Sequence, residues 1–144
     1  MSLPSVLFVC GRNAIRSPMG EALWRESFGA DAPARSCGVI PAAFVDGFMV
    51  TVMQELGEDL SDFSPVSLAG VGEPPASLVV SLSTAADRTA KEYALKTGAE
   101  FLAWPIPDPS ETPGSREERL DAYRETRDAI RARIRDWNNT RKSA

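Results

Sequence analysis

Short candidate strands that alternate with helical patterns constrain the fold of this chain more than any other feature. The first, Ser5 to Cys10, is an apolar run rich in β-branched and aromatic side chains, which is typical of a strand buried on both faces. The other candidate strands are residues 35–37, 78–82 and 101–104. This alternation predicts an α/β protein with a parallel sheet covered by helices on both sides. A length of 144 residues suits one domain, residues 1–144.

Capping signals predict where the helices begin. Ser17 before Pro18 predicts a helix with Ser17 as its N-cap, and Asp46 is expected to cap a second helix. The remaining helix starts are signalled by Ser83 or Thr84 and by the capping-box pair Ser115 and Glu118.

The last helix is expected to be long. Its expected buried stripe is Leu120, Tyr123, Ile130, Ile134 and Trp137. The basic residues near its end are expected to stabilise the helix terminus and face water, and fraying is expected from Asn138 onward.

The absence of histidine limits the chemistry open to the chain. It excludes Ser-His-Asp and Cys-His catalysis built within this sequence, and it excludes every histidine metal site. We expect neither a metal nor a cofactor. Any nucleophilic or acid–base chemistry must use other side chains, such as those of cysteine and aspartate.

Charge and cysteine content narrow the possible partners. The 16 Lys and Arg residues against 20 Asp and Glu residues give a net charge of −4, which argues against a broad nucleic-acid surface. Two cysteines are too few for a disulfide scaffold. The apolar run before Cys10 is too short for a signal peptide, and no stretch reaches the length of a membrane span. We expect a cytoplasmic protein with no nucleic-acid or membrane partner.

Two segments with distinctive chemistry, residues 10–17 and 105–113, both follow predicted strands and are therefore expected at one edge of the sheet. The first connects a buried strand to a helix start, where loop N–H groups and the helix dipole favour an oxyanion. Arg16 can hold two anion oxygens, and the same positive field stabilises a thiolate at Cys10. Ser17 can donate to that thiolate, and Asn13 tolerates the left-handed conformation of a tight loop.

Cys10 and Asp108 also have plain structural interpretations. Most free cysteines are small buried hydrophobic residues, and Asp108 before Pro109 is a common turn pair. The strand before Cys10 and the helix start after it favour the anion site. A proline-stiffened loop that is expected to face Cys10 favours a catalytic role for Asp108.

The segment VLFVCGRNAIRSPMGEA, residues 6–22, resembles the low-molecular-weight protein-tyrosine-phosphatase family, whose loop reads V-C-x-x-N-x-x-R-S. The segment 36–38, Ser-Cys-Gly, is similar to the family's S-A-G, and Asp108-Pro109 is similar to its late D-P. The resemblance implies a three-layer αβα sandwich. It also implies a four-stranded parallel sheet with a phosphate-binding loop after the first strand.

The resemblance also implies a two-step mechanism. Cys10 would attack phosphorus and form a thiophosphoryl intermediate, Arg16 would stabilise the equatorial oxygens, and Asp108 would protonate the leaving oxygen and then activate water. Asn13, Ser17 and Ser36 would support the loop. The residues that would bind phosphate are Gly11, Arg12, Asn13, Ala14, Ile15, Arg16 and Ser17.

Several positions depart from the family pattern. Ser110 and Glu111 stand where members that act on phosphotyrosine often carry aromatic residues, and Glu111 would repel an acidic substrate. Phe44 can supply an aromatic wall or belong to the core. Arg12 replaces a small or neutral residue, and it can recruit a second anion or reach solvent.

Cys37 takes the place of the family's alanine. One hypothesis is a redox role, in which Cys37 forms a reversible disulfide with Cys10. The plainer interpretation is a small buried residue that fills the space of an alanine.

The main functional hypothesis is a cysteine-dependent phosphomonoester phosphatase of protein-tyrosine type, acting on a phosphorylated protein or a small phosphomonoester. The same loop serves arsenate reductases, because arsenate mimics phosphate. Residues 81–88 contain no cysteine, so a reductase here would use an external thiol such as glutathione, mycothiol or glutaredoxin. The third hypothesis is a non-catalytic module that binds phosphate or a phosphorylated partner.

Overall fold

The computed structural model describes residues 3–143 and contains a four-stranded parallel sheet in the order β2-β1-β3-β4. The strands are β1 (Val6–Cys10), β2 (Ala34–Gly38), β3 (Leu78–Ser81) and β4 (Glu100–Ala103). Their bounds differ from the predicted ones by one residue at most. β1 lies inside the sheet, and its Val6 pairs with Ala34 of β2 and with Leu78 of β3.

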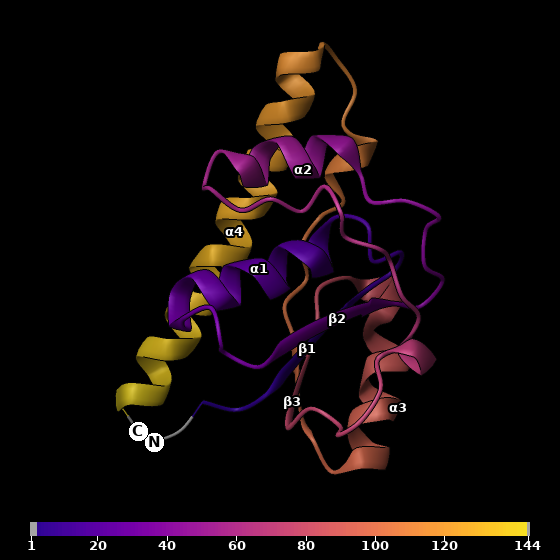
Figure 1. Ribbon diagram of the computed structural model, residues 1–144, viewed down its shortest axis with the longest axis vertical. Helices are drawn as coiled ribbons and strands as arrows, with labels where there is room; N and C mark the ends of the chain where they lie inside the picture. The colour runs from indigo at the N-terminus through magenta and orange to yellow at the C-terminus, as the bar shows by residue number, and fades with distance from the viewer. Residues whose placement is uncertain (1–2, 144) are drawn as a thin grey trace.

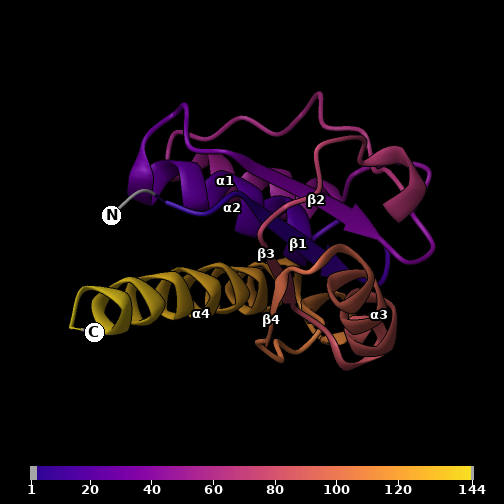
Figure 2. The ribbon, with the colours of Figure 1, turned by 90° about the horizontal axis from the view of Figure 1, so that it is seen from below.

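Helices cover both faces of the sheet (Figures 1 and 2). The helices are α1 (Arg16–Phe28), α2 (Gly47–Gln54), α3 (Asp87–Thr97) and α4 (Arg116–Ser143). α1 packs on β1, β2 and α4, α2 packs on α4, and α3 packs on β3 and β4. Because side chains alternate along a strand, Phe8 and Cys10 of β1 belong to the α1–α4 core, while Leu7 and Val9 belong to the α3 core. The predicted three-layer αβα sandwich is thus confirmed.

The start of α1 differs from the prediction. The helix begins at Arg16, and Ile15 occupies the N-cap position without a side-chain hydrogen bond. Ser17 is not the cap, because its hydroxyl lies 3.0 Å from the Cys10 Sγ and serves the loop instead. Pro18 fits this position since N–H groups in the first turn of a helix have no helical acceptor to lose.

The capping signals of α2 and α4 are confirmed, and the one before α3 is shifted. Asp46 Oδ1 accepts the Met49 N–H at 3.1 Å at the start of α2. Ser83 Oγ accepts the Ala86 N–H at 3.2 Å and caps a single 3₁₀ turn, after which α3 begins with Ala86 as its N-cap and no side-chain cap bond. In the predicted box before α4, Ser115 Oγ accepts the Glu118 N–H at 3.2 Å, and Glu118 Oε1 accepts the Ser115 N–H at 3.1 Å.

The end of α4 corrects a second expectation. The helix continues to Ser143 and does not fray from Asn138. Trp137 explains the difference, because its ring lies 4.9 Å from that of Trp24 in α1 and the Arg141 guanidinium lies over it at 5.2 Å. α4 is the longest of these helices and carries many charged residues.

Within residues 3–143, no helix is both long enough and apolar enough to cross a membrane.

Candidate active site

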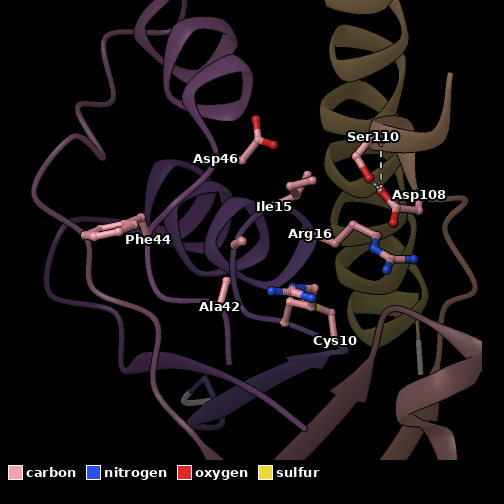
Figure 3. Close-up of a pocket in the computed structure, with 10 residues that line it drawn as sticks. Cys10, Ile15, Arg16, Ala42, Phe44, Asp46, Asp108 and Ser110 are labelled. Atoms are coloured by element: carbon pink, nitrogen blue, oxygen red, sulfur yellow. Dashed lines mark hydrogen bonds between the residues drawn. The ribbon is translucent and has the colours of Figure 1, made fainter. Parts of the chain in front are cut away.

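A pocket lies at the carboxyl edge of the sheet, where β1 ends (Figure 3). Cys10 and Arg16 contribute from the β1–α1 loop and the start of α1. Phe44 lies on the side of the loop after β2, and Asp108 lies on the opposite side, in the loop after β4. The structure therefore brings together the two segments that the sequence singled out, because parallel strands end at one edge of a sheet.

The Cys10 sulfur lies at the foot of the loop and is surrounded by donors. The residue is 2% exposed, and its Sγ lies 3.0 Å from the Ser17 Oγ and accepts the Asn13 N–H at 3.3 Å. Asn13 has φ 55°, the left-handed conformation predicted for this loop. The sulfur thus accepts one backbone hydrogen bond and lies within hydrogen-bonding distance of one hydroxyl group.

Asn13 is the hub of the loop and is fully buried. Its Nδ2 donates to Ser17 Oγ at 2.7 Å and to Ser36 Oγ at 3.0 Å, and its Oδ1 accepts the Val66 N–H at 2.9 Å. The structure thus gathers the three predicted support residues around one amide group. These bonds connect the loop to α1, to β2 and to the segment before residue 67.

A half-buried carboxylate, missed by the sequence analysis, extends this network. The Ser36 hydroxyl donates to Glu21 Oε1 at 2.7 Å, and Arg25 donates to Glu21 Oε2 at 2.7 Å. Because Ser36 gives its only proton to Glu21, its oxygen remains an acceptor for Asn13. The i,i+4 spacing of Glu21 and Arg25 predicts a helix ion pair, but no local pattern connects that pair to the loop.

The segment after β2 forms backbone hydrogen bonds with the outer side of the Cys10–Ser17 loop. The N–H groups of residues 39, 40 and 42 donate to the carbonyls of Cys10, Gly11 and Arg12 at 3.1, 2.9 and 2.8 Å. In the described chain the N–H groups of Gly11, Arg12, Ala14 and Ile15 have no acceptor. The loop carbonyls are therefore occupied, while those N–H groups are available to an anion.

Arg16 connects the loop to the opposite wall. Its Nη1 donates to the Ile106 carbonyl at 2.8 Å. This bond positions the guanidinium at the pocket and links it to the segment before Asp108. Glu111 lies outside this pocket and lines a neighbouring hollow that Arg16 and Asp108 also border. Trp104, 6% exposed, belongs to the core.

Asp108 makes the bonds of a turn residue and also lines the pocket. Its Oδ1 accepts the Ser110 N–H at 2.9 Å and the Ser110 hydroxyl at 2.7 Å, the bonds of a turn residue (Figure 3). Its Oδ2 makes no hydrogen bond or ion pair with any described residue, and Asp108 lines the pocket together with Cys10. One oxygen thus fixes the carboxyl group and the other is available to a ligand.

Phe44 and Arg12 form the other side of the pocket. Phe44 is 83% exposed, so it is a wall residue rather than a core residue. Arg12 is exposed and lines the same pocket.

Cys37 corrects the disulfide hypothesis. It pairs with Val9, and its side chain lies in the α3 core, whereas Cys10 belongs to the α1–α4 core on the opposite face. Side chains directed to opposite faces cannot be bridged without backbone movement, and both cysteines are free. Burial, with a smaller effect of Cys10, raises the pKa of the Cys37 thiol to about 12. The plainer interpretation, a small buried residue, is confirmed by its 0% exposure.

Comparisons with known proteins agree with this architecture. An arsenate reductase of Halalkalibacterium halodurans is 30% identical over 142 residues, which cover 99% of this chain and 100% of the relative. The tyrosine phosphatase amsI of Erwinia amylovora superposes with a TM-score of 0.75 at 18% identity, covering 96% of this chain and 93% of its own. The YwlE arginine phosphatase of Geobacillus stearothermophilus superposes with a TM-score of 0.76 at 20% identity, covering 98% and 94%.

The family described as low molecular weight phosphotyrosine protein phosphatase matches residues 5–143, from the first residue before β1 to the last residue of α4. This range includes the Cys10–Ser17 loop, Ser36 and Asp108. The chain therefore belongs to the low molecular weight phosphotyrosine protein phosphatase family.

Proposed function

We propose that the protein is a cysteine-dependent phosphomonoester phosphatase of protein-tyrosine type, acting in the reducing environment of the cytoplasm. The observation that carries the proposal is the arrangement of a buried nucleophile and an available carboxyl oxygen on one pocket. Cys10 Sγ lies beneath the uncommitted N–H groups of its loop, and Asp108 lines the same pocket with an unpaired Oδ2.

Each group has a step in this reaction. A phosphate dianion would occupy the loop N–H groups and the Arg16 guanidinium, with phosphorus above Cys10. The thiolate would attack phosphorus and form a cysteinyl phosphate while Asp108 gives its proton to the departing oxygen. Asp108 would then take a proton from water as that water attacks phosphorus, which releases phosphate and restores the thiolate.

Arsenate reduction is the second candidate, because the relative of Halalkalibacterium halodurans is an arsenate reductase. The loop would bind arsenate as it binds phosphate. The resolving thiol must come from outside, since Cys37 lies on the other face of the sheet and residues 81–88 contain no cysteine. This requirement separates the candidates experimentally.

The test compares three reactions of the same protein: hydrolysis of an aryl phosphate, hydrolysis of a phosphotyrosyl peptide, and arsenite release from arsenate with glutathione, mycothiol or glutaredoxin. We expect hydrolysis of both phosphoesters, unaffected by chelators and abolished in Cys10→Ser. Cys37→Ala is the matched control and retains turnover. Full activity of Cys10→Ser would refute the mechanism, and thiol-dependent arsenite release without hydrolysis would establish the reductase. Tight phosphate binding with no turnover of any substrate would support the non-catalytic module.

A leaving-group series tests Asp108. Asn at this position keeps an oxygen that can accept from Ser110 but carries no proton to transfer. We expect Asp108→Asn to lower kcat by about 10²-fold or more for phenyl phosphate, whose leaving group needs protonation, and by much less for p-nitrophenyl phosphate. An equal loss for both esters would show that Asp108 acts only through the turn that it forms.

A further inference from the structure

The charged residues that line the pocket differ in whether they are already engaged. Asp46 accepts from Met49 N–H and from the Tyr123 hydroxyl, Asp108 is bonded to Ser110, and Arg16 donates to the Ile106 carbonyl, as described above. Arg12 is the exception, because within residues 3–143 its side chain makes no hydrogen bond or ion pair. A cation without a partner at an anion-binding pocket is available to the ligand.

The backbone of Arg12 is held firmly although its side chain is free. Its carbonyl accepts the Ala42 N–H at 2.8 Å, and its carbonyl carbon lies so close to Gly38 that a Cβ added there would be 2.6 Å away. The Cα of Arg12 is thus fixed relative to Cys10. Only the side chain must be ordered when a ligand binds, which limits the entropic cost.

Arg12 and Asp108 occupy different sides of the pocket. Arg12 lies in the loop whose carbonyls accept from residues 39, 40 and 42, and it lines the pocket together with Ala42 and Phe44. Asp108 and Ser110 lie across the pocket from Ala42 and Phe44 (Figure 3). In the proposed reaction the leaving oxygen, which joins phosphorus to the rest of the substrate, faces Asp108. The peptide on either side of the phosphorylated residue then extends beyond that oxygen across the mouth of the pocket, where the exposed Arg12 is available to a flanking residue.

Apolar surface accompanies Arg12 on that side. Ile40 is 74% exposed and Phe44 is 83% exposed, and both belong to the same segment after β2. A peptide presents apolar and charged side chains together and can cover such a surface, whereas a small bisphosphorylated metabolite cannot bury it. The positive charge of Arg12 together with this exposed apolar surface favours a peptide ligand.

We propose that Arg12 forms a second anion subsite, which selects phosphopeptides that carry an acidic residue beside the phosphorylated one. This inference rests on the proposed phosphatase function and deepens it. The Arg12 guanidinium binds the flanking carboxylate, while Arg16 and the loop N–H groups bind the phosphate.

The test measures kcat/KM for two phosphotyrosyl peptides of one sequence, with Glu or Gln on both sides of the phosphotyrosine. At low ionic strength we expect the wild-type protein to prefer the Glu peptide about two- to fivefold, the range of an exposed ion pair. Added salt lowers this preference. In Arg12→Gln the ratio falls to about one, and in Arg12→Glu it inverts. Arg88→Gln, which removes the same charge from α3, keeps the wild-type ratio.

The possible outcomes test the Arg12 subsite separately from the proposed phosphatase function. If Arg12→Gln keeps the wild-type ratio, there is no subsite. If it loses the same factor on both peptides, Arg12 acts on the phosphoryl group and the proposal is wrong. A small bisphosphorylated compound hydrolysed faster than either peptide would assign the subsite to a metabolite and overturn the peptide. If the wild-type protein hydrolyses neither the peptides nor an aryl phosphate, both the phosphatase function and the subsite fail.

Discussion

At the scale of single residues, the site depends on buried side chains that each make several hydrogen bonds. Asn13 donates both amide protons and accepts one bond, so its orientation is determined. Ser17 accepts from Asn13 and has one proton left, which can go to Cys10 Sγ or to the Cys37 carbonyl 3.2 Å away.

The buried thiol of Cys37 makes a prediction about alkaline stability. Its pKa is about 12 in the folded protein and close to 9 in an unfolded chain. Above pH 9 the unfolded chain loses a proton that the folded protein keeps, so the free energy of unfolding falls by about 1.4 kcal/mol per pH unit from this group until the pH reaches the folded value. Cys37→Ala lacks this contribution.

Urea unfolding under reducing conditions measures the effect. We expect Cys37→Ala to be about 1 kcal/mol less stable than wild type at pH 7.5 because of the lost packing. The difference should shrink and then reverse between about pH 9 and pH 10.5. Parallel stability curves for the two proteins would mean that Cys37 is not shielded from solvent.

At the scale of elements, the loop from Cys10 to Ser17 is shaped from outside by the end of β2. Gly38 leaves no room for a side chain, because an added Cβ would lie 2.6 Å from the Arg12 carbonyl carbon and 2.7 Å from the Asn13 nitrogen. The two backbones therefore touch, and the bonds from residues 39–42 continue the contact. The position of the loop depends on β2 as much as on β1.

Gly38→Ala tests this contact, with Gly47→Ala as its matched control, since a Cβ at Gly47 meets nothing within 4 Å. We expect Gly38→Ala to lower the free energy of unfolding by about 1–3 kcal/mol and kcat/KM by about 10²-fold, because the loop must move. Gly47→Ala should change stability by less than about 0.5 kcal/mol. Urea unfolding and aryl phosphate hydrolysis measure both quantities. Normal turnover in Gly38→Ala would show that the loop tolerates displacement.

At the scale of the whole molecule, α4 joins the pocket to the core. The Tyr123 hydroxyl donates to Asp46 Oδ2 at 3.0 Å, which links α4 to the start of α2 and to the pocket wall. Burial, followed by the charge of Asp46, raises the pKa of Tyr123 well above its usual range, so the hydroxyl remains a donor at neutral pH. Glu55, after α2, pairs with Arg124 and Arg127 of α4 and continues the same contact.

Tyr123→Phe removes this bond without changing the shape of the core. We expect a loss of about 1 kcal/mol in the free energy of unfolding, since Asp46 Oδ2 loses its donor. Tyr93→Phe on α3 is the control, because the Tyr93 hydroxyl has no hydrogen bond with the described residues, and its change should stay within about 0.5 kcal/mol. Equal stability of Tyr123→Phe and wild type would show that the α2–α4 contact does not depend on this bond.

Local patterns predicted the elements because the interactions that form them are local. The apolar run of β1, the Asp46 cap and the Ser115–Glu118 box all act within a few residues and appear as predicted. Where a distant residue competes, the local signal fails. Ser17 has the sequence of an N-cap, but its hydroxyl bonds to the end of β1, and the turns after Asn138 stay helical because α1 packs on Trp137.

The sequence by itself determined the order of strands and helices, the loop from Cys10 to Ser17, and the placement of Asp108 on the same edge of the sheet. Only the tertiary structure decided which face of the sheet Cys37 joins and that Glu21 reaches the loop through Ser36. The physical reason is the distance along the chain over which each interaction acts. Secondary structure reflects the backbone and neighbours a few residues apart, whereas these contacts depend on strand register and on packing between segments far apart in the chain.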